Sequence, residues 1–263
     1  MLPKKIHYCW FGGNKLPDLA IKCIESWKKY CPDYEIIEWN ETNFDLECCD
    51  FVKEAYKAKK WAFVSDYARL KVVYDNGGIY LDTDVELVKS LDILLQEKCY
   101  FGEETTGYVN TGLGFGAEKH SPIIDLLLKE YYNKHFINDD GSYNMDPCPK
   151  INTKPLLQFG YSFSGNKIWR CDDFTVYPPE YFCPLEYNTN KMNITANTLS
   201  IHLFNASWLS TLDKLINRIE GSSKRGISLK IRRLVSFPFR VINKFKKNGF
   251  SNTIKQILNI IQR

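Results

Sequence analysis

Apolar and polar positions over the first forty residues predict a strand, a helix and a second strand. Residues 5–11 are rich in β-branched and aromatic side chains and run into a pair of glycines, as a strand does before a loop. From Leu19 to Trp27 apolar side chains recur at every fourth residue, which marks one face of a helix. Residues 35–39 repeat the strand pattern. This order predicts an α/β protein with a parallel sheet of the nucleotide-binding type.

A long helical pattern leads into two acidic residues that follow a short apolar strand. The helical spacing covers residues 51–75, and the sequence Asn-Gly-Gly at 76–78 predicts the end of the helix and a tight turn. The strand at 79–81 is followed directly by Asp82 and Asp84. Hard divalent cations take oxygen ligands and bind phosphates, and open α/β folds hold ligands at the carboxyl ends of strands. The sequence therefore predicts a metal site here; the alternative is an acidic turn without a ligand.

Four further segments complete the predicted architecture. Residues 110–116 have strand spacing with several glycines, and Ser121-Pro122 carries the residue types that begin helices. The stretch 138–155 is rich in Asn, Asp, Gly and Pro, so we expect a loop with the character of a lid. Residues 199–204 predict the last strand.

Asp66 and Arg69 are three residues apart within the long helical pattern, so their side chains are neighbours on one helix face. One interpretation is a surface ion pair, worth only a few tenths of a kcal/mol. However, the apolar residues around the pair predict a largely buried helix. Because a buried acid and a buried guanidinium both need partners, the pair is a candidate part of a binding site.

Charge divides the chain into an acidic body and a basic tail. The 263 residues carry a net charge of +4, with 35 Lys and Arg against 31 Asp and Glu. From Lys214 onward there are 13 basic residues and one acid, so the tail has a net charge of +12 and the body −8. We therefore expect one sizeable catalytic domain over residues 1–213 and a separate basic tail over residues 214–263.

The tail mixes apolar and basic residues as an interfacial amphipathic helix does, so we expect it to meet an anionic membrane surface. The alternatives are a helical pair that folds back on the body, or nucleic-acid binding, which no accompanying motif supports. The chain has nine cysteines without a Cys-x-x-Cys pair and begins without an apolar leader, which is typical of reduced thiols in a cytosolic protein. The expected location is thus cytoplasmic, peripheral on the inner face of the cytoplasmic membrane.

Four motifs, in this order, resemble glycosyltransferase family 32. They are Ile6-His-Tyr-Cys-Trp-Phe-Gly-Gly13, Ser65-Asp-Tyr-Ala-Arg69, Gly77-Gly-Ile-Tyr-Leu-Asp-Thr-Asp84 and His202 followed by Ser207-Trp208. The resemblance covers roughly residues 1–210 and implies the GT-A fold, a mixed and mostly parallel sheet flanked by helices. It also implies retaining transfer of a hexose from a nucleotide-diphosphate sugar, first of all a UDP-sugar, with Mn²⁺ or Mg²⁺. The family includes bacterial capsular-polysaccharide transferases, so the implied acceptor is a glycan, lipid-linked, in capsule or lipopolysaccharide synthesis.

The resemblance assigns the acidic pair to the metal and the donor. Asp84 is implied to bind the metal directly, and Asp82 to contact the donor ribose or sugar and the metal through water. His202 is an implied additional metal ligand; the alternative is a strand histidine with its hydrogen bonds satisfied inside the protein. A metal at this position would neutralise the charge that develops as the pyrophosphate leaves.

The remaining implied roles surround the donor. Trp10 would stack on the base, although it could equally belong to the core. Asp66 and Arg69 would hold the sugar hydroxyls and phosphate, and Ser65 and Tyr80 would line the same pocket. With the acidic pair, Asp66 and Arg69 are thus the candidate catalytic residues.

Two implied contacts come from segments farther along the chain. Ser207 and Trp208 would close over the pyrophosphate, with an anchor for the tail as the alternative role of the tryptophan. Asn110 and Thr111 would touch the donor or acceptor. The chain departs from many relatives at residues 152–155, Asn-Thr-Lys-Pro, where they carry Thr-Gly-Pro.

Two other functions fit parts of the same pattern. In a phosphatase of the haloacid-dehalogenase type, Asp82 would attack phosphate and Asp84 would act as the acid, but that class carries its motif on the first strand. In a non-catalytic membrane scaffold, the tail would bind the membrane and the acidic pair would be a remnant.

Overall fold

The computed structural model describes residues 1–163, 165, 167–186 and 191–205, together with residues 212, 215, 219, 235–240 and 242. Met1–Glu186 and Met192–Phe204 form one compact unit, and Tyr187–Lys191 and Asn205–Arg263 form another. Ser207, Trp208 and most of the predicted amphipathic tail lie outside the described residues. The predicted domain boundary after residue 213 therefore stays a prediction.

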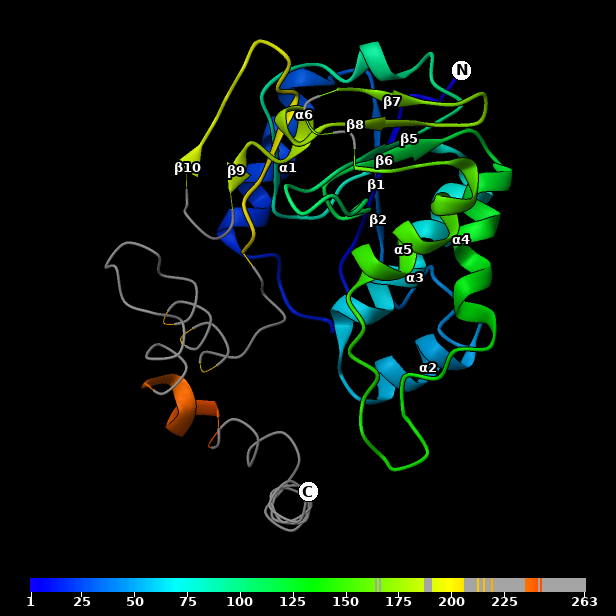
Figure 1. The fold of residues 1–263 in the computed structure, drawn as a ribbon, viewed down its shortest axis with the longest axis vertical. Coiled ribbons are helices and arrows are strands. Elements are labelled where there is room, and N and C mark those ends of the chain that lie inside the picture. Colours follow the sequence, from blue (N-terminus) through cyan, green and yellow to red (C-terminus); the bar gives the residue numbers. More distant parts are fainter. Residues whose placement is uncertain are drawn as a thin grey trace. The chain divides into compact units, whose positions relative to one another are not determined.

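The first unit is built around a seven-stranded sheet in the order β2-β1-β3-β6-β5-β8-β7. The pairings make β2, β1, β3, β5 and β8 run in one direction, with β6 and β7 opposed to them. This mixed and mostly parallel sheet flanked by helices (Figure 1) confirms the expected fold class. The strands are β1 (Lys5–Cys9), β2 (Glu35–Trp39), β3 (Gly78–Tyr80), β4 (Val85–Leu87), β5 (Cys99–Gly102), β6 (Phe115–Ala117), β7 (Trp169–Arg170), β8 (Thr175–Tyr177), β9 (Leu185–Glu186), β10 (Lys191–Met192) and β11 (Ser200–His202).

Helices cover both faces of the sheet. Alternation along β1 sends Ile6 and Tyr8 into a core shared with α1, and Cys9 into a second core shared with α2, α3 and α4. Figure 1 shows α3, α4 and α5 side by side. The helices are α1 (Asp18–Tyr30), α2 (Asp50–Lys57), α3 (Trp61–Asn76), α4 (Pro122–Tyr132), α5 (Cys148–Leu156) and α6 (Pro179–Phe182), with 3-10 turns at Asp92–Leu94 and Leu157–Phe159.

Several predicted elements are confirmed. Strand β1, helix α1 and strand β2 form the expected β-α-β unit, and β1 pairs with β2 in parallel. Helix α4 begins at Pro122 with Ser121 as its N-cap. Helix α3 ends at Asn76, and Gly77 follows with φ +67°, a conformation that side chains other than glycine's rarely adopt.

Three predicted boundaries are wrong. The helical pattern 51–75 is two helices, because Lys59 adopts φ +56° between α2 and α3. Of the predicted strand 110–116, only Phe115 and Gly116 are in a strand, β6, since the Asn110 side chain accepts the Gly112 N–H and holds a turn at the start of the range. The predicted loop 138–155 ends early, because α5 begins at Cys148.

No helix among the described residues has the length and hydropathy needed to cross a bilayer. All nine cysteines are free thiols.

Candidate active site at the ends of β3 and β4

The acidic pair lies in the connection between two short strands. Strand β3 ends at Tyr80 and β4 begins at Val85, and the Val85 N–H closes the turn by donating to the Asp82 carbonyl at 3.0 Å. Both aspartates therefore lie at the carboxyl end of β3, the edge at which open α/β folds hold their ligands. This confirms that the strand ends where the acidic residues begin.

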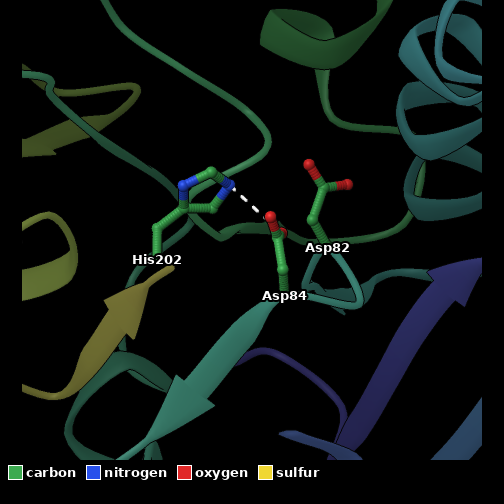
Figure 2. Close-up of side chains that lie close together, drawn as sticks. All are labelled: Asp82, Asp84 and His202. Carbon is green, nitrogen blue, oxygen red and sulfur yellow. Dashed lines mark ion pairs between the residues drawn. The ribbon is translucent and has the colours of Figure 1, made fainter. Parts of the chain in front are cut away.

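Antiparallel pairing brings His202 to the same edge from the far end of the sequence. Strand β11 pairs with β4, with His202 opposite Val85, and the Leu203 N–H donates to the Asp84 carbonyl at 2.9 Å. The imidazole consequently lies next to the Asp84 carboxylate, with Nε2 3.3 Å from Oδ1. Figure 2 shows the three side chains converging from β11 and the β3–β4 connection.

The three side chains have the chemistry of a divalent-cation site. One potential ligand atom from each of Asp82, Asp84 and His202 lies within 4.8 Å of the others. Nδ1 of His202 is buried and makes no hydrogen bond among the described residues, and its role as a metal ligand stays a prediction. Burial opposes protonation of His202, but the charges of Asp84 and then Asp82 outweigh it and raise its pKa. Two carboxylates and an imidazole suit Mn²⁺ or Mg²⁺.

Arg69 joins the long helix to the acidic pair. Its Nη2 lies 3.0 Å from Oδ1 of Asp66 and 3.3 Å from Oδ1 of Asp82, and its guanidinium lies 5.3 Å from the centre of the Tyr80 ring. The Tyr80 hydroxyl donates to the same Asp82 oxygen at 2.9 Å. Because the Arg69 side chain is only 5% exposed, this is a buried charge network, and the interpretation of Asp66 and Arg69 as a surface pair is wrong.

Burial dominates the protonation of Asp66. Loss of solvent raises the pKa of its carboxyl to about 6, although Arg69 acts in the opposite direction. Burial also raises the pKa of Asp82, again against the effect of Arg69. One arginine thus partly compensates two carboxylates, which leaves net negative charge where a cation would bind.

Gly112 brings a loop backbone into contact with this network. A Cβ on Gly112 would lie 2.5 Å from Oδ2 of Asp82 and 3.1 Å from Nη1 of Arg69. The turn that carries Gly112 is fixed by Asn110, whose Oδ1 accepts the Gly112 N–H at 2.7 Å. Asn110 is therefore placed beside the acidic pair, and Thr111 is buried behind it with Asn152 Nδ2 donating to its hydroxyl at 2.9 Å. The contact with donor or acceptor that the resemblance implies for both residues stays a prediction.

We expect Gly112→Ala to lower activity by about 10²-fold, because the added carbon must displace the Asp82 carboxylate or the Arg69 guanidinium. The measurement is the rate of donor turnover beside the melting temperature. Gly102→Ala is the matched control, since a Cβ there would meet the Phe182 ring at 2.9 Å and cause similar crowding elsewhere. Equal activity losses in both variants would show that crowding alone, and not the position of Asp82, is responsible.

Ser65 contacts the network through its backbone, and Trp10 directly follows β1. The Trp10 indole N–H donates to the Asn14 carbonyl at 2.6 Å, and the ring is partly buried against the core on the α1 face. The Ser65 carbonyl accepts a hydrogen bond from Arg69 Nε at 3.1 Å. Tyr80, by contrast, is only 1% exposed, so it supports Asp82 and Arg69 from beneath.

A cavity of about 700 Å³ opens where β1 and β2 end and α3 begins. The sequence did not single out its walls, because Gly12, Glu41 and Trp61 come from separate segments without a common motif. Glu41 accepts the Gly12 N–H at 2.5 Å, and the Tyr56 and Trp61 rings lie 5.0 Å apart. Its lining residues are Gly12, Gly13, Asn14, Glu41, Thr42, Tyr56, Lys59 and Trp61.

Helix α5 contributes further residues that the sequence did not reveal. Cys148 lies between Arg69 Nη1 and Asn110 Oδ1, at 3.7 and 3.8 Å. Lys154, which replaces the glycine of many relatives, continues the helix and pairs with Glu130 at 3.0 Å. Its backbone needs no glycine, while the neighbouring Thr153 hydroxyl accepts the Val109 N–H at 2.8 Å.

Comparison with known proteins finds a family match for the part of the chain that carries the acidic pair. Residues 17–101 match the model of the glycosyltransferase sugar-binding region containing a DXD motif. Inositol phosphoceramide mannosyltransferase 3 of Schizosaccharomyces pombe is 27% identical over 147 residues, which is 51% of this chain and only 40% of the yeast protein. An uncharacterized glycosyltransferase of Acanthamoeba polyphaga mimivirus is 24% identical over 223 residues, 79% of this chain and 84% of the viral protein.

Among solved structures, a glycosyltransferase involved in glycosylation of the major capsid of PBCV-1 aligns with a TM-score of 0.42 and 15% identity, over 77% of this chain and 94% of its own. The DXD motif of the matched region is Asp82-Thr-Asp84, the pair that the structure sets beside Arg69 and His202. The match of residues 17–101 to the glycosyltransferase sugar-binding region containing a DXD motif thus confirms the resemblance to glycosyltransferase family 32.

Proposed function

We propose that this protein is a metal-dependent, retaining glycosyltransferase that moves a hexose from a nucleotide-diphosphate sugar to a glycan acceptor. The observation that carries the proposal is the convergence of Asp82, Asp84 and His202 within 4.8 Å, beside the buried Arg69–Asp66 pair. A UDP-sugar is the proposed donor, on the basis of the family resemblance.

Each group has a distinct task in this proposal. Asp82, Asp84 and His202 would hold Mn²⁺ or Mg²⁺, which supplies positive charge to a departing nucleotide diphosphate. Arg69 fixes the Asp82 carboxylate through its 3.3 Å contact, and the Tyr80 hydroxyl does so from the other side. Asp66 presents a carboxylate for donor hydroxyls from α3. Such preorganised charges stabilise the transition state without reorganising during the reaction.

The phosphatase alternative does not agree with this arrangement. A nucleophilic aspartate must approach phosphorus freely, yet Oδ1 of Asp82 is occupied by both Tyr80 and Arg69. The acid expected at Asp84 instead lies beside the His202 imidazole. The family match favours sugar transfer over both the phosphatase and the non-catalytic scaffold.

We further propose a lipid-linked glycan as acceptor, in bacterial capsule or lipopolysaccharide synthesis, with the enzyme at the inner face of the cytoplasmic membrane. Two observations support the lipid-linked acceptor: the 13 basic residues against one acid after position 213, and a relative that is, by its name, a mannosyltransferase for inositol phosphoceramide. Capsule synthesis rests on the family resemblance.

A thermal-shift screen tests the transferase proposal. The full-length protein is melted with UDP-, GDP- and CMP-sugars, each with and without Mn²⁺, because a ligand that binds only the folded state raises the melting temperature. A shift that requires both a nucleotide sugar and the metal is expected, and it identifies the nucleotide. Unchanged melting with every combination would contradict the proposal.

The membrane proposal predicts vesicle binding that depends on lipid charge and salt. The full chain should sediment with vesicles that contain anionic lipid and not with neutral ones, because each basic residue near an anionic surface contributes about 1 kcal/mol. Removing residues 214–263 should greatly weaken this binding. If the shortened protein binds anionic vesicles as well as the full chain at low salt, the tail is not the anchor.

A further inference from the structure

Glu104 is a carboxylate at the edge of the site with no role in the assignments above. It follows β5 in a short antiparallel turn, in which its N–H donates to the Tyr108 carbonyl at 2.8 Å and Glu103 bridges Val109. Alternation places Glu104, Tyr108 and Asn110 on one face of the turn. The Glu104 side chain is neither buried nor fully exposed, as expected for a group at the mouth of a site.

Asn110 connects this carboxylate to the acidic pair. Its Nδ2 donates to Glu104 Oε1 at 2.6 Å, while its Oδ1 accepts the Gly112 N–H at 2.7 Å. Gly112 in turn touches Asp82, since a Cβ there would lie 2.5 Å from Oδ2. A single amide therefore fixes the position of Glu104 relative to the predicted donor and metal site.

The hydrogen bonds of Glu104 leave it able to accept more. The Thr106 hydroxyl donates to Oε2 at 3.1 Å, so each carboxylate oxygen has one partner among the described residues. Because each oxygen of an ionised carboxylate has about two acceptor positions, both can receive a further donor from the solvent side. A sugar hydroxyl is such a donor.

Exposed aromatic rings accompany this carboxylate. Tyr108 is 45% exposed and Phe163 is 57% exposed, and Phe163 packs on the same turn, with its ring 3.0 Å from the position of a Cβ on Gly107. The Tyr161 hydroxyl donates to the Gly107 carbonyl at 3.1 Å and fixes the turn from beneath. Aromatic walls with a few placed polar groups are typical of small-molecule sites, and the ring faces suit the apolar face of a pyranoside.

We propose, resting on the transferase function above, that Glu104 belongs to the acceptor subsite and receives the hydroxyl of a pyranoside acceptor. In the retaining transfer step the acceptor oxygen bonds to the anomeric carbon of the donor from the face at which the nucleotide diphosphate leaves. The bond from that carbon to the phosphate oxygen breaks, and its electron pair leaves with the nucleotide diphosphate. The hydroxyl proton passes to the departing phosphate oxygen, while Glu104 accepts a hydrogen bond from a neighbouring hydroxyl of the same acceptor and so positions the attacking oxygen.

Glu104→Gln tests this role, because glutamine retains an oxygen for the Asn110 amide but loses the negative charge that strengthens a hydrogen bond from a sugar hydroxyl. Glu97→Gln is the matched control: Glu97 is 15% exposed and pairs with Arg170 at 3.1 Å, and it accepts hydrogen bonds from Thr175 and Tyr177. Two measurements with the acceptor, together with the donor-induced thermal shift, are compared with wild type. One is transfer to methyl glycosides of glucose, galactose, mannose and N-acetylglucosamine; the other is saturation-transfer NMR of the same glycosides without donor.

We expect Glu104→Gln to lower transfer by about 10²-fold, because a misplaced acceptor oxygen costs about that much, and to weaken glycoside saturation transfer, while the donor-induced thermal shift persists. Glu97→Gln should match wild type in all three. Transfer at the wild-type rate by Glu104→Gln would overturn the proposal. Loss of both transfer and the donor-induced thermal shift would also overturn it, because Glu104 would then act in donor binding. The NMR measurement needs no donor, so it is independent of the thermal-shift screen. If no glycoside binds the wild-type protein, the acceptor subsite is contradicted, even where the donor screen succeeds. If a glycoside binds, the acceptor subsite is supported, even where the donor screen fails.

Discussion

Asp84→Asn is expected to lower transfer by at least about 10³-fold and to abolish the thermal shift that requires both metal and nucleotide sugar. Asparagine has nearly the same shape as aspartate but lacks the negative charge that a hard cation needs. The fold should persist, because the hydrogen bond from the Leu203 N–H goes to the Asp84 main-chain carbonyl and does not depend on the side chain. The pKa of His202 should fall at the same time, because the charge of Asp84 is the main cause that raises it.

The measurements are initial rates across a Mn²⁺ titration and Mn²⁺ binding by calorimetry. Glu86→Gln is the control, because Glu86 lies two residues farther along β4 and pairs with Lys22 at 3.2 Å, away from the acidic pair. This control should keep wild-type rates and metal binding. Unchanged turnover or metal affinity in Asp84→Asn would remove Asp84 from the proposed metal site.

The acidic pair was predictable because its signals are local. A helix end, a Gly-Gly turn and a short apolar strand precede Asp82 within a few residues, and each depends on neighbouring side chains only. Because the acidic pair comes directly after that strand in the sequence, its place at the strand's carboxyl end could be predicted without knowledge of the tertiary fold. The same reasoning identified β1, α1 and β2, for which the hydrophobic period and the loop residues agree.

The position of His202 depends instead on a pairing across more than one hundred residues. Only the register of β11 on β4, with His202 opposite Val85, brings the imidazole to Asp84, and a shift of one residue would turn it to the opposite face. No local pattern encodes that register, so the residues alone favoured a satisfied strand histidine over a ligand. The family resemblance supplied what the local pattern lacked.

The errors arose where tertiary contacts override local preference. Asn, Thr and Pro within residues 148–156 disfavour a helix, yet α5 forms there. It is stabilised by the bond from Asn152 Nδ2 to the Thr111 hydroxyl and by that from the Val109 N–H to the Thr153 hydroxyl. Glu104 has no sequence signature at all, because its link to the site runs through Asn110, six residues away along a turn.

Arg69→Met is expected to destabilise the protein by about 3–5 kcal/mol at neutral pH, because it leaves the Asp66 and Asp82 carboxylates buried without their cation. For a chain of this size that corresponds to a fall of roughly 10 °C in melting temperature. The measurement is guanidinium unfolding at pH 7.5 and pH 5. Arg170→Met is the control, since Arg170 is 56% exposed in its pair with Glu97, and loss of an exposed ion pair costs at most about 1 kcal/mol.

The loss of unfolding free energy caused by Arg69→Met should be smaller at pH 5 than at pH 7.5. Burial already raises the pKa of Asp66 from 3.8 to about 6 in the folded wild type, and Arg69 holds it down from a higher value. Without Arg69 the folded state binds a proton more tightly than the unfolded state does, so stability increases as the pH falls through the folded pKa toward the unfolded one. Adding Asp66→Asn should likewise restore part of the lost stability, because it removes one of the two uncompensated charges. The loss of unfolding free energy could instead be the same at both pH values and unaffected by Asp66→Asn. That result would show that Arg69→Met destabilises the protein through lost packing of the arginine side chain and not through buried charge.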